Sequence, residues 1–359
     1  MFDLISLGWN SYFQQQYNDV TNGVALVPGR IAVENKHRYV VLCEYGELNA
    51  EVSGKLLFMS ESVSELPKVG DWVLMSVFPD ENKGIIHHCL DRKTRFSRKQ
   101  AGMKFEEQII AANIDILFIV QGLDNNYNLR RLERYLVMAK NGNIEPVIIL
   151  SKADLCNSIE VKVREVEQIA GGNRILTVSA YSGQGIDQLE SIVSKNLTCA
   201  FVGSSGTGKS TLINTLAGEH LQHTSETREK DSRGRHTTTK RELIILSNGG
   251  ILIDTPGMRE FYLWAVDDSL EETFNEIEII SQNCMFSDCR HLVEKGCAVL
   301  EALDNGTISR ERYNSYVKLS KEREFLESKT DLDAFLKRKK RDKDRQKMIK
   351  QILKNINRK

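Results

Sequence analysis

The strongest constraint on the fold is the octapeptide GSSGTGKS at Gly203–Ser210. An apolar run, CAFV, precedes it, and TLINTLAG comes after it with helical character. In a strand, glycine loop and helix of this order, backbone N–H groups turn inward around phosphate oxygens, and the helix N-terminus favours the anion. The pattern predicts a phosphate-binding P-loop. The alternative is a Gly/Ser-rich turn with a chance lysine, and the correct flanks on both sides count against it.

Each position of this loop has an expected role. Lys209 should contact the β- and γ-phosphates and assist catalysis, and the Ser210 hydroxyl should ligate Mg²⁺. The motif predicts a bound nucleoside triphosphate without identifying its base. The other loop residues expected to bind the nucleotide are Gly203, Ser204, Ser205, Gly206, Thr207, Gly208 and Thr211.

Two other loops predict that the base is guanine. SKAD, Ser151–Asp154, directly follows the apolar run PVIIL, and Asp154 can accept hydrogen bonds from guanine N1–H and the exocyclic amine. Adenine offers an acceptor at N1, so the same carboxylate would be poorly paired. Lys152 is expected along the base plane. The alternative is a polar helix start capped near Asp154. The remaining expected base contacts are Ser151, Ala153 and, in the strand-ending VSA, Ser179 and Ala180.

The order of these motifs is informative. SKAD and VSA precede the phosphate loop, whereas in an ordinary Ras-like GTPase they follow it. Such loops all lie at the carboxyl edge of one parallel sheet, so cutting and rejoining the chain elsewhere leaves the pocket intact. We therefore expect a circularly permuted α/β GTPase core.

Two later segments predict the metal and switch parts of the site. DTPG begins with Asp254, expected in the Mg²⁺ shell, and ends with Gly257, whose amide can sense the γ-phosphate. GRHTTT lies in a charge-rich stretch, and Thr238 or Thr239 is the expected metal ligand. A segment ordered by the γ-phosphate and loosened after hydrolysis is the expected switch.

The catalytic residue is less clearly marked. Met258 stands two positions after Pro256, where Ras-like proteins place a water-orienting Gln, and a thioether does not position water. His236 is the first candidate for catalysis, against the alternative of an exposed loop histidine. We expect slow intrinsic turnover that a partner accelerates. Two rival classes stay open: an RNA-binding assembly protein that uses GTP as a structural ligand, and an ATPase of another P-loop class.

The flanks of the core differ from it in texture. Short β-rich runs recur between Val24 and Leu90 (VALVPGRIAV, RYVVLCEY, KLLF, DWVLMSVF and GIIHHCL), which is typical of a small antiparallel barrel or sandwich. Strands alternate with helices from about Ile114, where Asn128 is the expected N-cap of LRRLERYLVMAK. After Phe261 the sequence is helical. The expected domains are a barrel at 1–100, the GTPase at 101–268 and a helical unit at 269–359.

A cysteine and histidine cluster predicts a metal site in the helical unit. Cys284, Cys289, His291 and Cys297 have the spacing C-x4-C-x-H-x5-C. Three thiolates and one imidazole form a closed tetrahedral set, which favours one structural zinc ion over a catalytic one. The alternatives are chance clustering of reduced cysteines and a redox pair. An odd total of seven cysteines, without an export leader or a run of 18 apolar residues, favours the cytoplasm and no membrane.

Charge is balanced overall but not locally. The chain of 359 residues has 49 basic and 49 acidic residues, whereas Lys337–Lys359 holds twelve Lys or Arg and two Asp, a net of +10. We interpret this tail as an RNA-contacting helix or arm. The alternative is a solvated charged helix.

These residues together resemble a known family, the circularly permuted GTPases of the RsgA type (YjeQ/YloQ). The resemblance spans nearly the whole chain and includes VGDWV at 69–73, SRK at 97–99 and NLRRLERYL at 128–136, besides SKAD, GSSGTGKS, GRHTTT, DTPG and the cysteine and histidine cluster. Ser151 departs from the family, which has Asn there. The shorter side chain is expected to lose contacts to the base edge and to the phosphate loop.

The resemblance implies a particular architecture and role. The expected fold is an N-terminal OB-fold barrel, a central permuted P-loop GTPase and a C-terminal helical zinc-binding domain. The implied function is that of a monomeric GTPase, using GTP and Mg²⁺, that binds the small (30S) ribosomal subunit and 16S rRNA and assists late maturation. The subunit would stimulate hydrolysis, and hydrolysis would be coupled to release.

Overall fold

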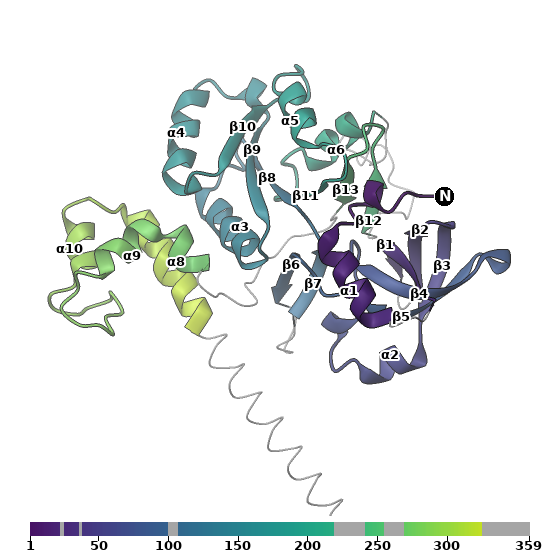
Figure 1. Cartoon of the computed structure of the whole chain (residues 1–359). Helices are drawn as coiled ribbons and strands as arrows, with labels where there is room; N and C mark the ends of the chain where they lie inside the picture. The colour runs from purple at the N-terminus through teal and green to yellow at the C-terminus, as the bar shows by residue number, and fades with distance from the viewer. Residues whose placement is uncertain (22–24, 36–37, 100–106, 219–240, 255–268, 325–359) are drawn as a thin grey trace, which may run out of the picture.

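The computed structural model describes the chain except for residues 22–24, 36–37, 100–106, 219–240, 255–268 and 325–359. Figure 1 shows a barrel with its N-terminal helix at one end, an α/β core in the middle and a helical unit at the other end. This is the multidomain fold that the sequence predicts. Among the described residues, no helix is both long and apolar enough to cross a membrane.

Five strands form the barrel. β1 pairs antiparallel with both β2 and β4, and β3 pairs parallel with β5, so the strand order β1-β2-β3-β5-β4 closes on itself as an OB-fold. The prediction of an N-terminal barrel is confirmed. The elements are η1 Ile5–Leu7, α1 Ser11–Thr21, β1 Val27–Asn35, β2 Arg38–Cys43, β3 Gly46–Val52, α2 Gly54–Met59, η2 Val63–Glu65, β4 Trp72–Phe78, η3 Pro79–Glu81 and β5 Lys83–Cys89.

Within the barrel, one predicted β-rich run is wrong and one strand was missed. KLLF lies in the helix α2, where Ser53 Oγ caps the first turn by accepting from Leu56 N–H at 3.2 Å. The apolar run has the sequence pattern of a buried strand, but in the structure it is not buried as such a strand would be: Phe58 is 90% exposed. The missed strand is β3, whose alternating sequence buries only Leu48 and Ala50.

The core is a six-stranded region in the order β10-β9-β8-β11-β13-β12. The first five strands are parallel, and β12 runs antiparallel to β13. Helices on both faces bury them, which is why they appear as continuous apolar runs. The elements are β8 Ile116–Gly122, α3 Leu129–Asn141, β9 Glu145–Ser151, η4 Ala153–Leu155, α4 Ile159–Ala170, β10 Arg174–Val178, α5 Ile186–Ile192, β11 Thr198–Val202, α6 Lys209–Ala217, β12 Glu242–Ile245 and β13 Ile251–Asp254.

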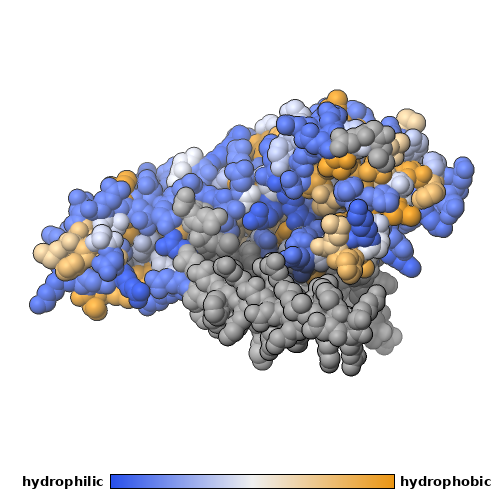
Figure 2. Space-filling model, turned by 60° about the horizontal axis from the view of Figure 1, so that its bottom comes forward, coloured by the Kyte–Doolittle hydropathy of each residue, from blue (hydrophilic) through white to orange (hydrophobic). Residues whose placement is uncertain are grey.

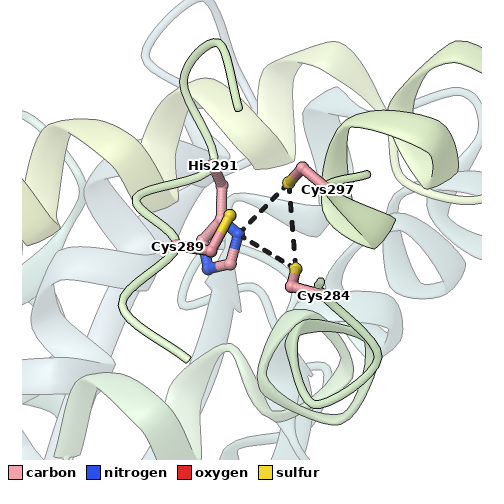
Figure 3. A group of neighbouring side chains, drawn as sticks. All are labelled: Cys284, Cys289, His291 and Cys297. Carbon is pink, nitrogen blue, oxygen red and sulfur yellow. Dashed lines mark hydrogen bonds between the residues drawn. The ribbon is translucent and has the colours of Figure 1, made fainter. Parts of the chain in front are cut away.

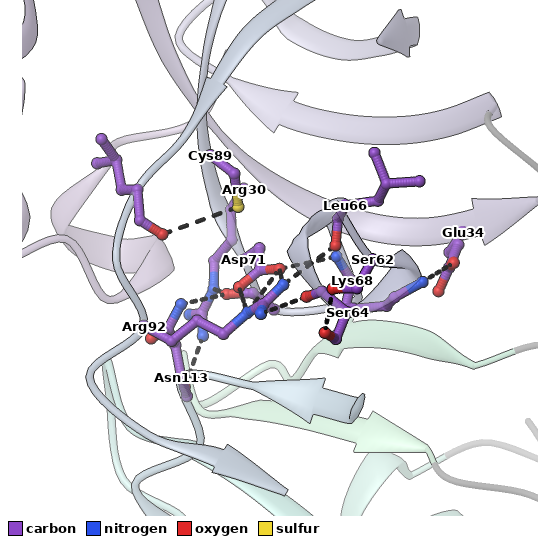
Figure 4. Close-up of polar contacts among 12 residues, drawn as sticks. Arg30, Glu34, Ser62, Ser64, Leu66, Lys68, Asp71, Cys89, Arg92 and Asn113 are labelled. Atoms are coloured by element: carbon purple, nitrogen blue, oxygen red, sulfur yellow. Dashed lines mark hydrogen bonds and ion pairs between the residues drawn. The ribbon is translucent and has the colours of Figure 1, made fainter. Parts of the chain in front are cut away.

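The barrel is joined to the core by backbone pairing and by a buried arginine. Val33 of β1 pairs with Glu242 of β12, so the two sheets are continuous. Arg30, 1% exposed, donates to Gly70 O at 3.3 Å, to Asn113 O at 3.0 Å and to the carbonyl of Leu7. Figure 4 shows Arg30 and Asn113 at this junction. One guanidinium therefore links the N-terminal segment, the barrel and the start of the core.

The motif VGDWV forms the turn at this junction. Gly70 has φ +90°, and a Cβ there would lie 2.1 Å from Ala112 O in β7, so a side chain does not fit. Asp71 is fully buried and accepts hydrogen bonds of 2.7, 2.9 and 3.1 Å from Arg92 (Figure 4). The short two-stranded sheet of β6 Arg95–Lys99 and β7 Glu107–Ala112 follows the barrel in the chain and lies against this turn at Ala112.

A buried ion pair attaches the C-terminal unit to the core. Glu133 of α3, 0% exposed, accepts from Arg312 at 2.7 Å and from Ser315 Oγ at 2.5 Å. Arg312 also donates to Glu276 at 2.5 Å, and its guanidinium lies 4.0 Å from the Phe274 ring centre. The unit contains α8 Ser269–Thr273, α9 Asn275–Ser281, α10 Ala298–Asp304 and a helical stretch at 310–324.

Glu133→Ala should lower the free energy of unfolding by about 2 kcal/mol. It removes the buried carboxylate that accepts from Arg312, Ser315 and Arg130, while Glu276 remains as a partner of Arg312. Urea unfolding followed by circular dichroism measures the change. Glu167→Ala, at an exposed position of α4, is the control and should change stability by less than about 0.5 kcal/mol. Equal stability of the two variants would contradict a stabilising role for the buried contacts of Glu133 with the C-terminal unit.

Candidate nucleotide site and metal centre

The predicted nucleotide loops meet at one edge of the sheet. SKAD follows β9, VSA ends β10, the glycine-rich loop follows β11 and Asp254 ends β13. These four strands are parallel, so their carboxyl ends lie on the same side (Figure 1). The permuted order of the motifs therefore still assembles one site.

The glycine-rich loop has the geometry of a phosphate cradle. Gly203 has φ +151°, and a Cβ there would lie 2.4 Å from Val120 O, so the tight turn out of β11 requires glycine. Lys209 Nζ donates to Gly203 O at 2.7 Å and to Ser204 O at 2.6 Å. The ammonium is thus held against the loop that would receive the phosphates. Ser204 Oγ is buried with no partner among the described residues, which fits a loop built to bind a polar ligand.

The two base loops contact each other and the phosphate loop. Asp154 Oδ1 accepts from Ser179 Oγ at 2.5 Å, which links SKAD to VSA. Ser151 Oγ donates to Thr207 O at 2.6 Å. The expectation that Ser151 loses its contact to the phosphate loop is therefore wrong, because the hydroxyl at the buried end of β9 is close enough to reach that carbonyl.

The magnesium and switch residues are only partly described. Ser210 lies in the first turn of α6, and Asp254 ends β13, which neighbours β11, so both lie at the same sheet edge. Their metal roles stay predictions. The other predicted residues, His236, Thr238, Thr239 and Gly257, lie outside the described residues, as do Met258 and the basic tail.

The loop between β8 and α3 carries contacts that the sequence motifs did not indicate. Asp124 pairs with Lys152 at 2.6 Å, and Asn126 Nδ2 donates to Ser205 O at 2.9 Å. Burial alone would raise the pKa of Asp124, but hydrogen bonds from Lys152 and from the Asn126 amide bring that pKa below its ordinary value. The sequence signal for these residues was their position alone: they directly follow β8, the strand that lies between β9 and β11 in the sheet.

The cysteine and histidine cluster is assembled as predicted (Figure 3). The four ligand atoms lie within 4.8 Å of one another. Cys284 and Cys297 sulfurs are 3.9 Å apart, and His291 Nδ1 lies 3.6 Å and 3.4 Å from them. A zinc tetrahedron with bonds of about 2.3 Å to sulfur and about 2.0 Å to nitrogen has edges of roughly 3.5–3.8 Å. The cluster therefore has the size of a zinc site.

The surroundings hold these ligands in place. Tyr313 donates its hydroxyl hydrogen to His291 O at 2.5 Å, and Leu300 N–H points to the Cys297 sulfur at 3.4 Å. Burial lowers the pKa of His291, which keeps the imidazole neutral and able to bind a metal. Burial raises the pKa of Cys297 to about 11, so metal binding must displace a proton from this thiol.

Exposed apolar side chains surround the same cluster. Figure 2 shows orange groups at the far left end of the molecule, where the C-terminal unit lies. Contiguous exposed apolar side chains are typical of an interaction surface. The exposed apolar residues here include Met285, Phe286, Leu292 and Val293.

The strand order, the glycine-rich cradle and the two base loops define a circularly permuted P-loop GTPase. A family model described as "RsgA GTPase" matches residues 89–264, and one described as "50S ribosome-binding GTPase" matches residues 198–357. The chain belongs to the RsgA GTPase family and is a GTP-hydrolysing enzyme.

Full-length relatives agree with this assignment. A protein of Opitutus terrae named "Small ribosomal subunit biogenesis GTPase RsgA" is 41% identical, covering 91% of this chain and 92% of its own. A Leptospira interrogans protein of the same name is 39% identical, covering 99% and 98%.

Two crystal structures are similar to this one. YjeQ from Thermotoga maritima has a TM-score of 0.60 at 28% identity, covering 83% of this chain and 99% of its own. YloQ, described as a circularly permuted GTPase, has a TM-score of 0.58 at 24% identity, covering 84% and 96%, and supports the fold alone.

Asp154→Asn should weaken GDP binding on the order of a hundredfold, because an amide presents a donor to the donor edge of guanine. Xanthosine diphosphate, which has a carbonyl in place of the exocyclic amine, should bind the variant better than GDP does. Fluorescence titration with both nucleotides measures the exchange of preference. Unchanged GDP affinity would exclude Asp154 from the base site.

The purified protein should contain one zinc ion per chain, and Cys297→Ser should lose most of it, as measured by elemental analysis. Cys156→Ser, outside the cluster, should retain the metal. Zinc affinity should fall between about pH 8 and about pH 6, because protons compete for the thiols that zinc must deprotonate. Zinc content that is equal in both variants would contradict the site.

Proposed function

We propose that this GTPase binds the small (30S) ribosomal subunit, contacts 16S rRNA and assists late maturation of the subunit. The subunit stimulates GTP hydrolysis, and hydrolysis is coupled to release. The observation that carries the proposal is the combination of a barrel, a permuted P-loop core and a zinc-type cluster in one chain. Relatives named for small-subunit biogenesis align over nearly the full length, which supports the same role.

The proposed site follows the motifs. Lys209 and the segment holding His236, Thr238 and Thr239 act on the γ-phosphate, and Ser210 and Asp254 hold Mg²⁺. Guanine is bound by SKAD and by VSA, and the phosphates by the loop 203–211 and the Gly257 amide. The four residues of the cysteine and histidine cluster hold one structural zinc ion.

The proposed division of labour uses three units, 1–100, 101–268 and 269–359. The barrel and the zinc unit grip RNA on either side of the core in the GTP state and release it in the GDP state. Two joints support this coupling: β12, which lies between the GRHTTT and DTPG segments, pairs with barrel strand β1, and Glu133 of the core clamps Arg312. The exposed apolar residues around the zinc cluster and the basic tail supply contact surface. The protein acts as a cytoplasmic monomer.

The alternative partner is the large subunit. It is favoured by one observation, the match of residues 198–357 to a model described as "50S ribosome-binding GTPase". That match covers the phosphate loop and the segments after it, whereas the small-subunit relatives also align with the barrel. Small-subunit binding is therefore the better-supported choice.

GTP hydrolysis should rise at least tenfold with 30S subunits and much less with 50S subunits, and ATP should not replace GTP. Phosphate release by the purified protein measures each rate. Lys209→Ala is the control and should abolish the stimulated rate by removing the phosphate-binding ammonium. Stimulation by 50S alone would favour the alternative partner, and a rate that ignores both subunits would leave the GTPase without the ribosomal role.

A further inference from the structure

The β8–α3 loop, residues 123–128, occupies a central position that no nucleotide motif covers. It leaves the carboxyl end of β8, which lies between β9, the strand of SKAD, and β11, the strand of the phosphate loop. Leu123 N–H donates to Ser151 O at 2.9 Å, so the loop starts in contact with the base-binding segment. Its polar side chains then reach both halves of the nucleotide site.

The first contact is with the base half. Lys152 has φ +59°, a left-handed conformation, and stands immediately before η4. Its Nζ lies 2.6 Å from Asp124 Oδ2, and Asp124 Oδ1 accepts from Asn126 N–H at 2.9 Å. The side chains are 33% and 25% exposed, so water screens the pair only in part. The end of the Lys152 side chain is therefore fixed by Asp124.

The second contact is with the phosphate half. Asn126 Nδ2 donates to Ser205 O at 2.9 Å, in the middle of the glycine-rich loop. The other end of the same amide accepts from Arg131 at 2.9 Å. Arg131 is anchored on α3, and Gln121 Nε2 holds Asn126 O at 2.9 Å. Asn126 thus connects the phosphate loop to a rigid strand and a rigid helix.

We infer that Asp124 and Asn126 are positioning residues for the nucleotide, Asp124 acting through Lys152 on the purine ring and Asn126 acting through Ser205 on the phosphates. The inference rests on the proposed guanine site and adds two residues to it. A lysine stem has four rotatable bonds and loses conformational freedom when it lies along a base. Asp124 holds that side chain in advance, so binding orders less. Asn126 likewise presets the phosphate loop relative to the base loop.

A double-mutant cycle tests the Asp124 part. Asp124→Asn should weaken GDP binding about fivefold, the upper end for a part-exposed ion pair. In a Lys152→Ala background the same change should have no further effect, because Asn keeps an oxygen for the Asn126 N–H and the lysine that met the lost carboxylate charge is gone. Asp80→Asn, at an exposed barrel position, is the matched control and should bind GDP normally. Titration of fluorescent GDP gives all affinities.

Asn126→Asp tests the phosphate part. The change keeps the size of the side chain and the acceptor for Arg131, but it places an oxygen against Ser205 O. Affinities for GDP and inosine diphosphate should fall by the same factor, about tenfold for a lost hydrogen bond to a preorganised loop, because the two ligands share their phosphates. Melting temperatures of all variants should stay within about 2 °C of the parent.

The outcomes separate this inference from the proposed site. Parent protein that binds GDP, with Asp124→Asn binding equally well or with additive losses in the cycle, would overturn the role of Asp124 and leave the guanine site standing. A selective loss of GDP over inosine diphosphate in Asn126→Asp would overturn its role at the phosphates. Failure of the parent to bind GDP would instead remove the proposed site itself.

Discussion

Parallel pairing of the core strands is the constraint on which the rest of the molecule depends. Because β8, β9, β10, β11 and β13 run in one direction, every loop at their carboxyl ends meets at the same edge. The order in which the chain visits these strands then has no influence on the chemistry of the edge. A permuted chain therefore places the same loops around a nucleotide. It also allows other domains to be attached at both ends of the core.

Those other units are attached by buried polar contacts as well as by apolar surface. Arg30 satisfies three carbonyls from three segments, and Glu133 is matched by Arg312 and Ser315. A buried charge in such a joint tolerates few alternative geometries, because any misplacement leaves it unpaired in a low-dielectric interior. The joints therefore fix the orientation of the units more narrowly than apolar packing alone would.

Features that depend on local spacing could be predicted from the sequence: the glycine-rich loop, the buried core strands, the N-cap at Asn128 and the metal cluster. The prediction failed at α2, because its exposed apolar residues have the sequence pattern of a strand. It also failed at β3, because this half-polar strand has the composition of a loop. It also misjudged Ser151 and passed over Asp124 and Asn126, because their contacts join loops that follow different strands. Barrel closure decides where β3 pairs, and sheet register decides which loops meet at the nucleotide site. Both depend on contacts between segments that are distant in sequence, and the local periodicity of apolar residues does not predict such contacts.

The permuted strand order also sets the sequence of events during synthesis. Among the core strands, β8, β9 and β10 are made first and can pair at once, but the partner of the other edge of β8 is β11, and β13 is made later still. A nascent chain thus carries a finished base-binding half and an open strand edge before any phosphate loop exists. Ligand-assisted folding by a nucleotide is therefore delayed until the core is almost complete, and the early intermediate must be protected by its own helices.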